Sequence, residues 1–260
     1  MKPWKLAGKI LCLLVFAFLM APLIVVIITA FGTTRHVMFP PKGFTLDWFR
    51  EAVENKEFLN SILLSIKLSS LSVVVSCILG TMVSLYFWKA DSKLRNLWET
   101  IFLSPIVVPT VISAVALLQY FALFGFNSTF RRLALSYIAI EIPYVIRAVT
   151  ASLSSLDASF EEASLVLGAS PFKTLFKVTL PCVKGGIIAG AIFSFVVAFD
   201  EAVIVMFIRN SRTITYPLRL YSYITESFTP LISAFATIFI VLSFIVIIII
   251  EKTIGLNKMY

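Results

Sequence analysis

The sequence predicts an all-α integral membrane protein with six transmembrane helices. Of its 260 residues, 59% are hydrophobic and only 14% are charged, whereas a soluble domain has about 25% charged residues. The apolar residues form blocks long enough to cross a bilayer, which takes about 20 residues. The charged residues lie between these blocks, a position typical of loops and headgroup anchors.

The blocks follow one another as a single transmembrane domain over residues 1–260. The first block also resembles a signal peptide, but it is longer than the usual apolar stretch of about 7–15 residues, so an uncleaved helix is favoured. A polar connector follows it, in which residues 45–53 fit a short interfacial helix. The predicted spans are about 10–31, 61–88, 101–124, 133–153, 185–208 and 231–250.

Pro105 and Pro109 interrupt the third span. Neighbouring helices can satisfy the carbonyl groups that a proline frees in a membrane. The break therefore fits either a helix that lines a pathway or a simple packing kink.

The lysines indicate the orientation of the chain. With the N-terminus inside, lysines and arginines together number 11 on the inner side and nine on the outer side, which barely separates the two. The lysines alone separate more cleanly, with ten on the inner side and two, Lys42 and Lys56, on the outer side. Positive residues favour the cytoplasmic side, so we expect both termini to be cytoplasmic. The ten are Lys2, Lys5, Lys9, Lys89, Lys93, Lys173, Lys177, Lys184, Lys252 and Lys258.

Composition argues against several other classes of protein. The net charge of +8 is not gathered into a stripe that could bind nucleic acid. The three cysteines have no metal-ligand or redox spacing, and His36 is the only histidine. The chain also has no Walker A, Gly-x-Ser-x-Gly or His-Glu-x-x-His motif. We therefore expect no catalytic residue, no metal site and no cofactor, and an integral membrane enzyme is disfavoured.

The segment 157–181 cannot span a membrane and is predicted to form two short helices. Ser159 and Glu162 have the spacing of a capping box, and Gly168 is placed to end the first helix in a left-handed conformation. Ser170 is expected to cap a second helix that Pro181 closes. Phe160, Ala163, Val166 and Leu167 form an apolar stripe on the first helix. The stripe fits either a loop lying on the headgroups or a surface that docks into a partner.

This segment resembles the EAA loop of the permease subunits of ATP-binding-cassette (ABC) importers. The family pattern is Glu-Ala-Ala, three residues, Gly, nine residues, Ile, any residue, Leu-Pro. The chain keeps this spacing from Glu162 through Gly168 to Pro181, with Ser164 in place of the second Ala and Val178 in place of Ile. Residues 39–44, 103–110, 142–147 and 199–204 also resemble, in order, the second permease of polyamine-type importers.

The resemblance implies partners and a function. The loop would dock onto an ATP-hydrolysing subunit through Glu162, Ala163, Gly168 and Ala169. The complex would contain a second, different permease, two ATPase subunits holding ATP and Mg²⁺, and an extracytoplasmic substrate-binding protein, in a bacterial inner membrane. The solute would be a small cation such as a polyamine, with opines, amino-acid derivatives and phosphonates as alternatives. A channel or secondary transporter is disfavoured, because the chain shows no clear internal repeat.

Three acidic residues fall within predicted spans, where a charge is costly and often functional. Asp200 and Glu201, in the fifth span, fit either a lining that attracts a cationic substrate or an ion pair or cap at a helix break. Glu141, in the fourth span, is a further candidate for the pathway. Its expected partner is Arg147, Lys67 or a group on the second permease, although Lys67 is close enough to the end of its span to reach the interface.

Overall fold

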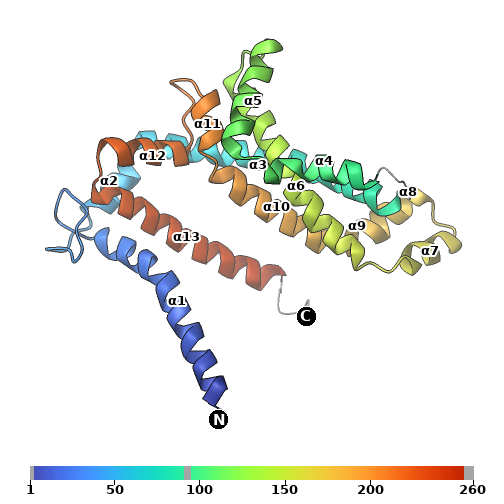
Figure 1. Cartoon of the computed structure of the whole chain (residues 1–260), viewed down its shortest axis with the longest axis horizontal. Coiled ribbons are helices and arrows are strands. Elements are labelled where there is room, and N and C mark those ends of the chain that lie inside the picture. Colours follow the sequence, from blue (N-terminus) through green and yellow to red (C-terminus); the bar gives the residue numbers. More distant parts are fainter. Residues whose placement is uncertain (1–2, 91–94, 255–260) are drawn as a thin grey trace. The chain divides into compact units, whose positions relative to one another are not determined.

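In the computed structural model, which describes residues 3–90 and 95–254, every regular element is a helix. This confirms the all-α class. Lys2, Lys93 and Lys258, which contribute to the predicted orientation, lie outside the described residues. The helices (Figure 1) are α1 (Pro3–Thr29), α2 (Asp47–Glu54), α3 (Lys56–Lys89), α4 (Arg95–Val107), α5 (Thr110–Leu123), α6 (Thr129–Ser154), α7 (Ser159–Val166), α8 (Pro171–Thr174), the π-helix η1 (Leu175–Thr179), α9 (Leu180–Cys182), α10 (Lys184–Phe199), α11 (Val203–Ile208), α12 (Tyr216–Glu226) and α13 (Pro230–Ile254).

Three of the described helices, α1, α3 and α6, are individually long and apolar enough to cross a membrane, and each coincides with a predicted span. Two bent pairs, α4 with α5 and the helices from Pro171 to Cys182 with α10, raise the number to five if each pair is one span. The sixth predicted span falls on α13, whose described apolar part, Pro230–Ile245, is shorter. The count of six therefore stays a prediction.

Two predicted spans are interrupted in the structure. The third bends by 105° between α4 and α5, where Pro109 directly precedes α5. The fifth predicted span, 185–208, contains a break, because α10 ends at Phe199 and α11 begins at Val203. At this break a carboxylate oxygen of Glu201 accepts a hydrogen bond from the backbone N–H of Ile204, 2.8 Å away. That bond satisfies a free amide at the start of α11, so a new helix begins there.

The chain divides into two compact units, residues 1–59 with 220–260 and residues 60–219. In the first unit α13 packs against α1 and α2. The hydroxyl of Thr29 donates to that of Ser233 over 3.1 Å, and the rings of Phe58 and Phe235 stack with centroids 4.1 Å apart. Helix α2 confirms a short helix near the predicted 45–53.

The second unit is built around α6. Helix α10 packs along one side of α6, as Figure 1 also shows, and α3 contacts another. The approach is close because small residues face α6: a Cβ added to Gly80 of α3 would lie 2.7 Å from Cβ of Val145. One added to Gly186 of α10 would lie 2.6 Å from Cβ of Ser152. Small residues that let backbones approach are typical of helix pairs in membranes.

Candidate functional site

The segment 157–181 folds as a helical loop between α6 and α10. Helix α7 confirms the first predicted helix. The second is more complex, because α8, the π-turn η1 and α9 follow one another and lead into α10 at Val183. Pro181 lies within α9 and does not close the helix as predicted. The backbone N–H of Leu180 bonds to the carbonyl of Leu175, five residues back, which places one wide turn in the loop.

Local hydrogen bonds fix the ends of α7. The predicted capping box is wrong, because Ser159 is already inside the helix and the cap residue is Ala158. Instead, a carboxylate oxygen of Asp157 accepts from the N–H of Ser159 at 2.9 Å. Hydrogen bonds from the backbone and side chain of Ser159 hold the pKa of Asp157 below its ordinary value. At the other end, Gly168 has φ +85°, which confirms the predicted left-handed residue.

Helix α8 begins as the sequence predicts. The hydroxyl of Ser170 accepts from the N–H of Lys173 at 3.3 Å, and Pro171 occupies the first turn. This cap fixes the direction in which the chain leaves Gly168.

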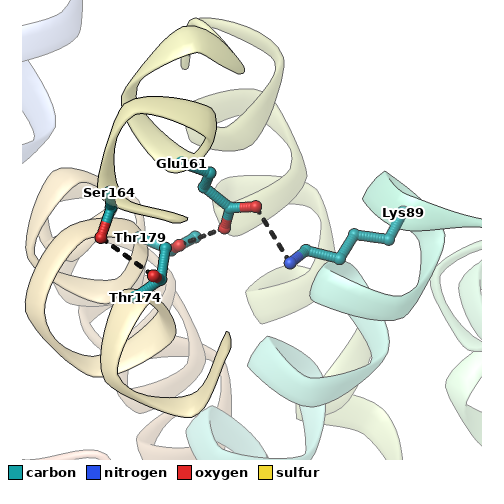
Figure 2. Close-up of polar contacts among 5 residues, drawn as sticks. All are labelled: Lys89, Glu161, Ser164, Thr174 and Thr179. Atoms are coloured by element: carbon teal, nitrogen blue, oxygen red, sulfur yellow. Dashed lines mark hydrogen bonds and ion pairs between the residues drawn. The ribbon is translucent and has the colours of Figure 1, made fainter. Parts of the chain in front are cut away.

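One face of α7 is bound to the rest of the second unit (Figure 2). The Nζ of Lys89, at the end of α3, lies 3.0 Å from Oε2 of Glu161. The hydroxyl of Thr179, in η1, donates to Oε1 of the same carboxylate. Three residues along α7, the hydroxyl of Ser164 lies 2.9 Å from that of Thr174 in α8. Glu161 and Ser164 thus hold α7 against three other elements.

The opposite face of α7 is open. Glu162 and Ala163 are exposed, as is Phe160, and the side chains of Val166 and Leu167 are each 87% exposed. Of the other predicted contacts, Gly168 is exposed and Ala169 is half-buried. An apolar row this exposed is unusual for a soluble surface. The predicted stripe therefore has no partner within the described part of the chain.

Glu141 lies at the middle of α6 with its side chain fully buried. The hydroxyl of Ser72, on α3, donates to Oε1 over 2.6 Å. Its Oε2 has no hydrogen-bond partner among the described residues. Arg147 and Lys67, two of the expected partners, are both exposed, and the partner found in this chain is Ser72; a partner on the second permease stays a prediction. The carboxyl bonds to the hydroxyl of Ser72 on α3, so no second charge has to be buried beside it.

Asp200 and Glu201 have different environments at the break between α10 and α11. Asp200 is exposed. Glu201 is half-buried, and its carboxylate caps α11, which confirms for this residue the alternative of a cap at a helix break. The hydroxyl of Tyr137 in α6 also donates to the carbonyl of Glu201 over 3.3 Å. Among the described residues, no side-chain hydrogen bond joins Asp200 or Glu201 to Glu141.

Comparison with known protein families identifies the family of this chain. Residues 72–254 match the model of the family of binding-protein-dependent transport system inner membrane components. The chain belongs to this family. It is therefore a permease of a binding-protein-dependent importer, and the family is one of transport proteins rather than enzymes.

Relatives cover almost the whole of this permease. It is 27% identical over 234 residues to the spermidine/putrescine transport system permease PotC of Escherichia coli K12, covering 90% of this chain and 88% of that one. It is also 27% identical over 243 residues to the putrescine transport system permease PotI of the same strain, covering 91% and 85%. The molybdenum transport system permease ModB of Mycobacterium bovis matches at 25% identity over 68% of this chain and 73% of that one.

Solved structures have the same fold. A bacterial ABC transporter involved in the import of alginate matches with a TM-score of 0.69 at 18% identity, covering 98% of this permease and 97% of that chain. A bacterial alginate transporter in complex with a pentasaccharide-bound periplasmic protein matches with a TM-score of 0.74 at 17% identity, covering 96% and 95%.

Sequence reasoning missed Lys89, Glu161 and Thr179. Glu161 precedes the motif residue Glu162 and looks equivalent to it in the sequence. The available signal was helical geometry, because residues three apart share a face of a helix and Glu161 therefore lies on the side of Ser164. Ser72 was missed too, although the serines and Gly80 of α3 recur every three or four residues.

Proposed function

We propose that this permease forms half of a pathway for a small cationic solute of the polyamine class and couples to an ATPase through the loop 157–181. The importer relatives PotC and PotI, named for spermidine and putrescine, support the substrate class. In this arrangement the chain has six spans with both termini in the cytoplasm. It works with a second permease, two ATPase subunits that bind ATP and Mg²⁺, and an extracytoplasmic binding protein.

The observation that carries the coupling role is the open face of α7. It combines a motif-spaced acid, Glu162, with Ala163 and two side chains that are 87% exposed, Val166 and Leu167. Apolar side chains surrounded by a polar rim fit the buried centre of a protein interface. Gly168 and Ala169 at the following turn complete the proposed contact.

The acidic residues contribute unequally to the proposed pathway. Asp200 is exposed at a helix break, so its carboxylate is free to attract a cation entering the pore. Glu201 caps α11 and would act mainly by shaping that break. Glu141 is fully buried in this conformation, so a role in the pathway requires α3 and α6 to separate.

The test is purification of the tagged, full-length permease from membranes of its own cell. We expect an ATPase to co-purify with the wild type and with Glu54→Lys, which reverses an exposed carboxylate outside the loop. Glu162→Lys should reduce the recovered ATPase at least tenfold, because it places the opposite charge in the docking face. Uptake of radiolabelled putrescine or spermidine into vesicles should fall with it.

Two results would contradict the proposal. If Glu162→Lys recovers as much ATPase as the wild type, the loop is not the docking surface. If vesicles with a functional complex take up an amino-acid derivative, an opine or a phosphonate but no polyamine, the substrate class is wrong while the coupling role stands.

A further inference from the structure

Glu161 occupies a position where three elements of the second unit meet. Its side chain is 12% exposed, and that of Lys89 is 55% exposed. Both carboxylate oxygens are used, Oε2 by Lys89 at 3.0 Å and Oε1 by the hydroxyl of Thr179. Thr179 is fully buried. Figure 2 shows the carboxylate between the end of α3 and the η1 turn.

This arrangement differs from an ordinary surface ion pair. Exposed pairs contribute little because water competes for both charges. Here the carboxylate is largely removed from water and both of its oxygens have donors, so the pair is held in one geometry. The Ser164–Thr174 contact, one turn along the same face, adds a second point of attachment.

The attached face and the open face belong to the same short helix. Glu161 and Ser164 contact other elements of the unit (Figure 2), while Glu162, Ala163 and Val166 are exposed. Any displacement of the open face by a bound partner therefore reaches the carboxylate of Glu161 within one helical turn. From there it passes to Lys89, the last residue of α3.

Helix α3 is suited to carry such a displacement into the pathway. It is one continuous helix of 34 residues. Along its length Gly80 lies against Val145, and Ser72 bonds to Glu141, both on α6. A shift at Lys89 thus acts on a rigid element that contacts the central helix of the unit at two levels.

We propose that Glu161 is a positioning residue that fastens the docking helix to α3 through Lys89 and to η1 through Thr179, so that ATPase movement is passed to α3. This proposal rests on the proposed coupling role of the loop. Glu162 contacts the ATPase, whereas Glu161 contacts only its own chain. Of the two neighbouring glutamates, Glu162 therefore serves docking and Glu161 serves the transmission of movement.

The link is tested first on the permease alone, in lipid nanodiscs, by hydrogen–deuterium exchange of the α7 amides. Glu161→Gln and Lys89→Met should each speed exchange about two- to fivefold, the size expected for a partly exposed ion pair. The double variant should be no faster than either single variant. Glu162→Gln is the matched control and should leave exchange unchanged. Unchanged exchange in Glu161→Gln, or additive effects in the double variant, would overturn the link.

The second test uses the complete complex in proteoliposomes, with putrescine uptake and ATP hydrolysis measured together. Glu161→Gln should keep its ATPase subunits but hydrolyse about two- to fivefold more ATP per putrescine imported. The charge-swapped Lys89→Glu/Glu161→Lys protein should recover the wild-type ratio of ATP hydrolysed to putrescine imported. The control variant Glu54→Gln should have the wild-type ratio. A purely structural role would lower the amount of complex and leave the ratio unchanged.

The outcomes separate the two proposals. Loss of the ATPase from Glu161→Gln would mean that Glu161 itself docks, which overturns the link. Failure of the wild type to bind any ATPase would contradict the proposed function, while the exchange measurement on the permease alone would still decide whether Glu161 fastens α7.

Discussion

At the scale of single residues, the carboxylates show how far a sequence can assign roles. Glu161 and Glu162 are adjacent and chemically identical, yet one is bound by two donors and the other is exposed. The motif identified Glu162 because the distances along the chain between motif residues can be taken directly from the sequence. The contacts of Glu161 depend on Lys89 and Thr179, which are distant in the sequence, so no local pattern could predict them.

Glu141 gives a prediction at the same scale. Glu141→Gln should leave the free energy of unfolding unchanged or raise it by about 1 kcal/mol, because the amide keeps an acceptor for Ser72 and cannot carry a charge at the centre of a span. Ser72→Ala should lower that free energy by about 1 kcal/mol, since the buried carboxyl then loses its donor. Thermal unfolding in detergent measures both.

Ser69→Ala is the matched control for Glu141 and Ser72. Its hydroxyl is buried on the same helix and has no hydrogen-bond partner among the described residues, so its removal should cost little. A loss of stability in Glu141→Gln as large as that in Ser72→Ala would show that the charge itself stabilises the fold.

At the scale of helices, hydropathy located the spans but not their interruptions. The apolar blocks of α1, α3 and α6 are continuous, and their positions could be predicted. Pro109 gave a signal for the bend after α4, because proline lacks an N–H. The break after Phe199 had a weaker signal, since Asp200 and Glu201 fit a cap as well as a pathway. The π-turn in the loop had no recognised signal at all.

The contact between α10 and α6 yields a prediction for this scale. Gly186→Ala should lower the free energy of unfolding by about 1–3 kcal/mol, because the new Cβ would lie 2.6 Å from Cβ of Ser152 and 2.8 Å from the carbonyl oxygen of Ala148. Gly8→Ala in α1 is the control, with nothing within 4 Å. It should be neutral or stabilising by up to about 1 kcal/mol. Equal unfolding temperatures for the two variants would contradict the close packing.

At the scale of the whole molecule, the distribution of lysines predicts an orientation that the fold alone does not give. Seven of the arginines between the predicted spans lie on the opposite side and only Arg95 on the side of the loop 157–181, whereas the lysines are concentrated on the side of that loop. This asymmetry predicts that the loop is cytoplasmic. The cytoplasmic position is also the one that a docking surface for an ATPase requires.

Thiol labelling checks this orientation. In a variant that keeps only Cys182, which is exposed in α9, a membrane-impermeant maleimide should label inside-out vesicles and spare right-side-out ones. Lys42→Cys, placed in the connector after α1 on a background without native cysteines, should give the opposite pattern. The reverse result for both sites would invert the topology and move the loop away from any cytoplasmic ATPase.

The wide turn at η1 has a consequence for how this chain tolerates change. A π-turn accommodates one residue more than the α-helix around it. Loss of one residue between Leu175 and Thr179 would therefore close the wide turn to an α-helical turn and leave the direction of α10 unchanged. Insertion of one further residue would instead rotate all that follows by about 100° about the helix axis, and Gly186 would no longer face α6.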